Sequence, residues 1–126
     1  MILDVDDLLL VARTVLGAPP LVRDYGLLAS AAARPAAVVL GQDAYPDLAT
    51  KAAALLHSLC ENHALIDGNE RLAWTATVVF IGLNRRTSVP AVDVDRAEAF
   101  MIAVADGTLH EVGAIAGELR RLGLVG

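Results

Sequence analysis

The sequence predicts an all-α fold, a compact bundle of about six helices with little or no sheet. The chain has 126 residues, of which 56% are hydrophobic but only 4% aromatic. Much of the apolar content is alanine and leucine, which favour helix over strand. Apolar residues also recur at helical spacing rather than in strict alternation. The length suits one compact domain, which we expect to cover residues 1–126.

Glycine, proline and capping residues divide the chain into elements. Asp24 and Asp47 are positioned to cap the second and third helices, and Gly17 with two prolines ends the first. Residues 108–111 have the form of a capping box for the last helix. The predicted helices span about residues 4–16, 25–33, 48–62, 69–84 and 108–122, with a fifth that starts at Asp93 or Asp95 and ends near residue 105. The fourth is apolar on nearly all sides, so we expect it to be the central helix.

Two connecting stretches have weaker patterns. Residues 36–40 fit either a helical turn or a short extended piece, and residues 41–46 have the composition of a loop. Residues 85–92 form a connection that contains Pro90.

Composition narrows the function classes. The formal charge of −5 argues against a nucleic-acid-binding protein, because such proteins usually carry a basic face. The single cysteine, Cys60, rules out an internal disulfide and fits a reducing cytoplasm. The start of the chain lacks the basic region of a signal peptide. The longest apolar stretch, residues 72–83, is too short to span a bilayer, so we expect a cytoplasmic protein without a membrane segment.

Residues 63–71, which read HALIDGNER, concentrate unusual chemistry in one loop. Histidine as a residue type exchanges protons near neutral pH, which makes His63 a candidate general base. Asp67 offers hard oxygen ligands suited to Mg²⁺. Gly68 permits a turn at the start of the fourth helix, whose free N–H groups form an anion site. Arg71 adds a guanidinium that matches phosphate oxygens.

These parts are the ones that phosphoryl or nucleotidyl transfer requires, because that chemistry depends on positioning and charge stabilisation. Simpler interpretations exist for each residue. A histidine at a helix end is commonly a capping or surface residue, and an Asp-Gly-Asn run is commonly a turn. A thiol catalyst formed by Cys60 and His63 is also conceivable at their spacing, whereas His57 has the position of a helix-surface residue.

The loop and its flanking segments resemble the Fic/Doc family. Fic proteins carry a motif of the form His-x-Phe-x-Asp/Glu-Gly-Asn-Gly-Arg, and the Doc (death-on-curing) branch has Lys in place of the second glycine. Residues 63–71 follow this pattern, with Leu65 at the phenylalanine position. Residues 23–35 (RDYGLLASAAARP) and 45–56 (YPDLATKAAALL) resemble the Doc-type segments RDxGLLESALARP and YPxLxEKAAxLL. The resemblance covers roughly residues 7–121, most of the chain.

The resemblance implies the fold and the chemistry of the Doc branch. Such proteins are toxins of Phd/Doc toxin–antitoxin pairs, which use ATP and Mg²⁺ to phosphorylate a hydroxyl of elongation factor Tu and are inhibited by a Phd-like antitoxin. Fic relatives instead transfer AMP. By this resemblance His63 would be the base and Asp67 the metal ligand. The remaining implied residues are Gly68, Asn69, Glu70 and Arg71 for the phosphates, with Ala44 and Tyr45 in a flap over the target.

Glu70 departs from the family pattern, because it occupies the position of the Doc lysine. One unit charge interacts with another by roughly 3 kcal/mol at about 5 Å and an effective dielectric near 20, so an anion here opposes a bound polyphosphate. The side chain also crowds the approach that glycine permits in AMP-transferring relatives. Three explanations stay open: a weakened or repurposed protein, an inactivating substitution, or a carboxylate that joins the metal site. The alternatives to a kinase are therefore an AMP transferase or an inactive protein that only binds its antitoxin.

Overall fold

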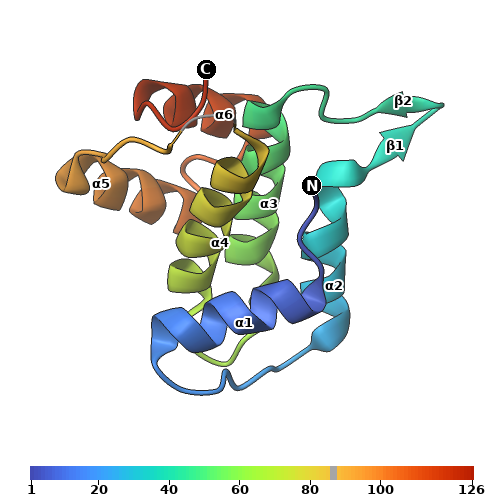
Figure 1. Cartoon of the computed structure of the whole chain (residues 1–126), viewed down its shortest axis with the longest axis vertical. Coiled ribbons are helices and arrows are strands. Elements are labelled where there is room, and N and C mark those ends of the chain that lie inside the picture. Colours follow the sequence, from blue (N-terminus) through green and yellow to red (C-terminus); the bar gives the residue numbers. More distant parts are fainter. Residues whose placement is uncertain (86–87) are drawn as a thin grey trace.

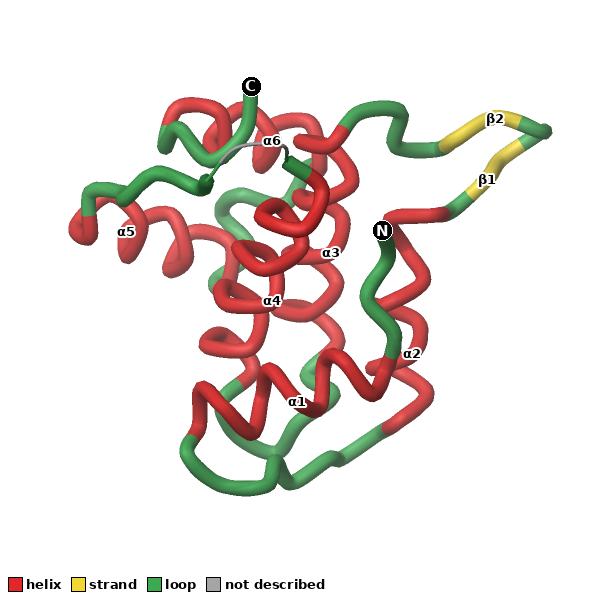
Figure 2. Tube along the Cα trace, in the orientation of Figure 1, coloured by secondary structure: helices red, strands yellow, loops and turns green. Residues whose placement is uncertain are grey.

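The computed structural model describes residues 1–85 and 88–126, so part of the predicted 85–92 connection lies outside the described residues. Its elements confirm the mostly helical class and are drawn in Figures 1 and 2. They are α1 (Val5–Leu16), α2 (Tyr25–Ala33), the 3₁₀ turn η1 (Arg34–Ala36), β1 (Val38–Val39), β2 (Gln42–Asp43), α3 (Leu48–Asn62), α4 (Asn69–Asn84), α5 (Val94–Ala105) and α6 (Val112–Arg121).

Aspartate caps explain why four helix starts were predictable. In each case the cap carboxylate accepts the backbone N–H three residues further on, which satisfies a donor that the first turn leaves free. These pairs are Asp4–Asp7, Asp24–Leu27, Asp47–Thr50 and Asp93–Arg96. Gly17 ends α1 in the left-handed region at φ 75°.

The centre of the protein is shared by α3 and α4, which lie side by side while α1 crosses near their lower ends (Figure 1). The prediction of α4 as the central helix therefore needs a correction, because α3 buries nine residues along its length. Four of these are alanines, whose small side chains allow close helix packing. The core that the two helices anchor extends from Leu3 to Val125.

The predicted loop over residues 41–46 is wrong at its start, because β1 and β2 form a short antiparallel hairpin. Leu40 and Gly41 make its two-residue turn with φ values of 51° and 78°. Such turns match the twist of the strands but need positive φ at both positions. Leucine rarely adopts that conformation, so the sequence carried little signal for the turn.

The predicted capping box at residues 108–111 is also wrong, since α6 begins only at Val112. The Thr108 N–H instead bonds to the carboxylate of Asp106 at 2.8 Å. The Leu109 N–H returns to the Ala103 carbonyl at 2.9 Å, which closes the end of α5. Residues 108 and 109, which were predicted to start the last helix, are therefore used to terminate α5.

Replacing Thr77 by valine should stabilise the protein. Thr77 is fully buried in α4, and its Oγ1 lacks a hydrogen-bond partner within the described residues. Valine keeps nearly the same shape and removes the unsatisfied hydroxyl, so the free energy of unfolding should rise by about 1 kcal/mol. Urea denaturation measures this change, with Thr75→Val on the half-buried face of α4 as the control. A clear loss of stability in Thr77→Val would contradict the prediction.

Candidate active site

His63 stands at the end of α3 in a left-handed backbone conformation with φ 48°. Arg23, from the segment before α2, holds this helix end. Its Nε donates to the His63 carbonyl at 2.8 Å and its Nη2 donates to the Asn62 carbonyl at 3.0 Å. A guanidinium at the carbonyl end of a helix satisfies free acceptors and opposes the negative end of the dipole. Arg23 therefore fixes the backbone from which the imidazole projects.

The loop that follows His63 is joined to residues 21–24 by backbone hydrogen bonds. The Ala64 carbonyl accepts two N–H groups from that segment, and Val22 pairs with Leu65 in an isolated antiparallel bridge. Leu65, at the phenylalanine position of the family motif, is 2% exposed. The smaller side chain is thus still buried in the core and anchors the loop.

Asn69 closes the loop with its side chain. Its Oδ1 accepts the Leu65 N–H and its Nδ2 donates to the Leu65 carbonyl, both at 2.9 Å. The amide of Asn69 is therefore engaged in shaping the loop. Asn69 could therefore contact a phosphate only through its backbone N–H at the start of α4.

Gly68 precedes α4 at φ 85°, where other residues are strained. A Cβ at this position would lie 2.6 Å from Cδ2 of Leu16 at the end of α1. The glycine is therefore required both by its conformation and by the close packing of α1 against the loop.

Replacing Gly68 by alanine should destabilise the protein by about 2 kcal/mol. The left-handed backbone alone costs roughly 1–2 kcal/mol for an L-residue, and Leu16 must also move. Urea denaturation tests this effect. Gly113→Ala on α6 is the matched control, because a Cβ there meets nothing within 4 Å. Equal effects of the two substitutions would show that the Gly68 backbone is not constrained.

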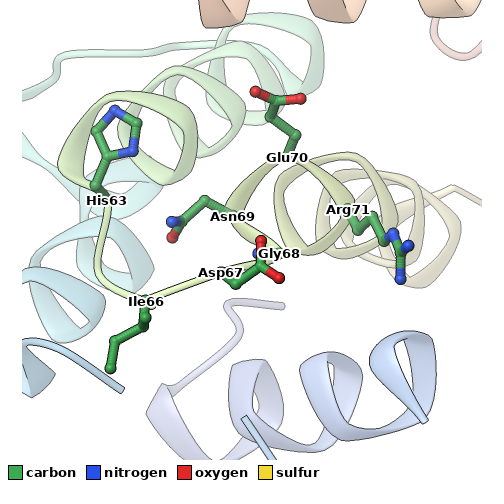
Figure 3. A pocket seen from close by; sticks show the side chains of 7 residues that line it. All are labelled: His63, Ile66, Asp67, Gly68, Asn69, Glu70 and Arg71. Carbon is green, nitrogen blue, oxygen red and sulfur yellow. The ribbon is translucent and has the colours of Figure 1, made fainter. Parts of the chain in front are cut away.

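A hollow of about 270 Å³ lies over this loop and is lined by residues 63 and 66–71 (Figure 3). Asp67 faces it, with Oδ1 accepting the Gly68 N–H at 2.9 Å. Gly68 caps α4 without a side-chain bond, so the first N–H groups of α4 remain for an anion. The structure thus brings together the predicted base, metal ligand and phosphate-binding residues in one place.

Glu70 and Arg71 project in different directions from the first turn of α4 (Figure 3). Arg71 lies at the edge of the hollow away from His63. Among the described residues no ion pair joins Glu70 to Arg71. Glu70 is exposed and lines the same hollow as His63, so its carboxylate would oppose a phosphate that binds there.

Cys60 is not suited to thiol catalysis. It is 4% exposed on α3. Burial, with a further contribution from the charge of Glu70, raises the pKa of the Cys60 thiol to about 12. A reactive cysteine needs a lowered pKa and access to solvent, so the Cys60–His63 alternative fails.

Ala44 and Tyr45 lie at the other end of α3 from His63, beside the β1–β2 hairpin (Figure 1). A helix of 15 residues is about 22 Å long, and neither residue lines the hollow at the loop. Lys51 holds the stem of the hairpin through the carbonyls of Pro35 and Tyr45. The assignment of Ala44 and Tyr45 to a target flap stays a prediction.

Three residues that join α3 to other residues near the site were not identified from their chemistry in the sequence. Arg23 and Arg34 lie in a family-like segment, but nothing local shows that they reach α3. His57, expected on the helix surface, is instead half-buried between Arg34 and Glu61. In each case the partners are distant along the chain or depend on packing, so only the fold reveals them.

The fold and the loop define a class of protein, a small helical protein with a histidine and a helix N-terminus at one hollow. The Fic/DOC family model matches residues 2–81. A similar curated protein is the "Toxin Doc" of Mycolicibacterium smegmatis, which is 50% identical over 114 residues, 89% of this chain and 88% of that protein. The chain belongs to the Fic/Doc family, and its resemblance to the Doc branch is confirmed.

None of the helices among the described residues has both the length and the apolarity needed to cross a membrane. Residues 1–85 and 88–126 also contain no group of three or more His, Cys, Asp or Glu side chains that could hold a metal ion. Mg²⁺ that arrives with a nucleotide commonly uses only one or two carboxylates, and Asp67 offers one.

Proposed function

We propose that this protein is a toxin of a toxin–antitoxin pair and transfers the γ-phosphoryl group of ATP to a hydroxyl of elongation factor Tu. The observation that carries the proposal is the shared hollow, which both His63 and the first turn of α4 line, with no side-chain cap bonded to that turn. A general base beside an anion site is the minimum that phosphoryl transfer needs. The similarity to a protein named Toxin Doc supports the biological role.

Each residue of the loop has a role in this proposal. His63 accepts the proton of the attacking hydroxyl, and Asp67 would hold Mg²⁺ through its carboxylate. The backbone N–H groups of residues 69–71 and the guanidinium of Arg71 hold the phosphate oxygens, while the Gly68 N–H stays bonded to Asp67. ATP, when bound, supplies the phosphoryl group that is transferred. Arg23 and Asn69 keep the loop in the required conformation.

A Phd-like antitoxin would inhibit the protein in the cytoplasm by laying a helical segment on its surface. Residues on α1 such as Val11 and Val15 are candidates for that groove. Val11 is half-buried against the core, which also fits a plain packing role. Growth arrest on expression, relieved by a small antitoxin encoded next to the toxin, is the expected behaviour.

Incubation with elongation factor Tu and labelled ATP tests the reaction. Label from the γ-phosphate on the factor supports the proposed kinase, whereas label from the α-phosphate identifies an AMP transferase. Absence of both labels would contradict an enzymatic role.

The second candidate is a catalytically inactive protein that only binds its antitoxin. The exposed carboxylate of Glu70 in the hollow specifically favours it, because that charge opposes binding of a polyphosphate. Antitoxin binding without transfer of either label distinguishes this candidate.

A further inference from the structure

A second hollow, of about 460 Å³, adjoins the first and shares His63 with it. α3 contributes His57 and Glu61, and the connection between α5 and α6 contributes Asp106 and His110. A general base has to reach the group that it deprotonates. Because the first hollow takes the phosphates in the proposed function, the second offers a space beside His63 for the hydroxyl-bearing acceptor.

Arg34 lies behind this second hollow and joins three segments of the chain. Its Nε donates to the Tyr45 hydroxyl at 2.9 Å, and its guanidinium lies 5.5 Å from the centroid of the Tyr45 ring. Its Nη1 reaches Nδ1 of His57 at 2.8 Å and donates to Oγ of Ser58 at 2.9 Å. One half-buried side chain of η1 therefore connects the hairpin stem to the middle of α3.

The contact with Arg34 fixes the protonation of His57. A guanidinium can only donate, so Nδ1 of His57 must be the acceptor and the ring proton must be on Nε2. Nε2 lies 2.7 Å from the carboxylate of Glu61 and donates to it. The imidazole thus has one tautomer and one orientation, which in turn orient the carboxylate of Glu61 in the second hollow.

Burial is the main factor that favours the neutral form of the His57 imidazole. Burial lowers the pKa of His57 below the ordinary histidine value, and the positive charges of Arg34 and His110 lower it further. Glu61 acts in the opposite direction. The ionisable groups that face His57 or share its hollow come from η1, α3, the hairpin stem and the connection between α5 and α6: Arg34, Glu61, His63, Tyr45, Asp106 and His110.

We infer that Arg34 is a positioning residue for the acceptor, because it fixes the His57–Glu61 pair beside His63 and ties the hairpin to α3. This inference rests on the proposed function. Arg34 lines neither hollow, so it does not touch the reacting groups and acts only through His57 and Tyr45. Its loss should therefore weaken acceptor binding and leave the phosphate side of the site intact.

Steady-state phosphate transfer to elongation factor Tu tests the inference. In Arg34→Met the KM for the factor should rise by about tenfold, while the KM for ATP stays within about twofold. Arg34→Lys keeps the positive charge but not the planar guanidinium with its several N–H donors. The KM for the factor should therefore rise less in this variant than in Arg34→Met. Arg96→Gln, which removes an exposed arginine from α5, is the matched control and should change neither KM.

¹⁵N NMR of the His57 ring provides a readout that does not depend on activity. The wild-type protein should show the Nε2–H tautomer, and the pKa of His57 should rise in Arg34→Met because a neighbouring cation is removed. Lower stability with both KM values unchanged, or with both raised equally, would show a merely structural role and overturn the inference. If the wild-type protein transfers no phosphate, the proposed function fails. An unchanged His57 spectrum in Arg34→Met would then show separately that Arg34 does not position His57.

Discussion

Replacing Glu70 by lysine should tighten ATP binding and raise the rate of phosphate transfer, each by at least about tenfold. The substitution changes the charge beside the phosphates by two units. Each unit contributes roughly 3 kcal/mol at about 5 Å and an effective dielectric near 20, so even strong screening leaves more than the 1.4 kcal/mol of a tenfold effect. Calorimetry with ATP and transfer from γ-labelled ATP measure the two changes, and growth arrest should become more severe.

Two further variants show whether the gain in ATP binding and transfer comes from removing the negative charge, from adding a positive one, or from a change of charge anywhere on the surface. Glu70→Gln removes the negative charge without adding a positive one and should give an intermediate gain. Glu98→Lys makes the same charge change at an exposed position of α5, outside the hollow, and should have no effect. Unchanged growth together with no phosphate transfer in Glu70→Lys would refute the view that Glu70 limits the phosphate-transfer activity of this protein.

Replacing His63 by asparagine should reduce phosphate transfer by at least about a hundredfold, the usual contribution of a positioned general base. Asparagine is chosen because it tolerates the left-handed backbone that His63 adopts, so the loop should keep its shape. ATP binding should remain within about twofold, because in the proposed function the phosphate contacts come from the first turn of α4, which includes Arg71.

Rates of transfer in Glu70→Lys and in the double variant with His63→Asn measure this loss on the more active background. Calorimetry on the same proteins checks that ATP still binds. Transfer within tenfold of the parent protein would mean that His63 is not the base and that another group accepts the proton.

Local signals predicted most of the helices. Asp24 and Asp47 lie where helices must begin, because a carboxylate there satisfies the free N–H groups of the first turn. The structure starts α2 and α3 where these caps indicated. Prediction failed at the hairpin turn and at the start of α6. Leu40 adopts an unusual positive φ, and the end of α5 uses residues 106–109 for its own closure.

By itself the sequence determined the family and located the candidate loop, because a motif of adjacent residues can be recognised without knowledge of the fold. The tertiary structure decided how that loop is held. Arg23 reaches the end of α3 from 40 residues away, and Leu16 packs where a side chain at position 68 would be. The structure also placed Arg34 against His57, which lines a second hollow. Contacts between segments so far apart depend on how the helices pack, and no local pattern records them.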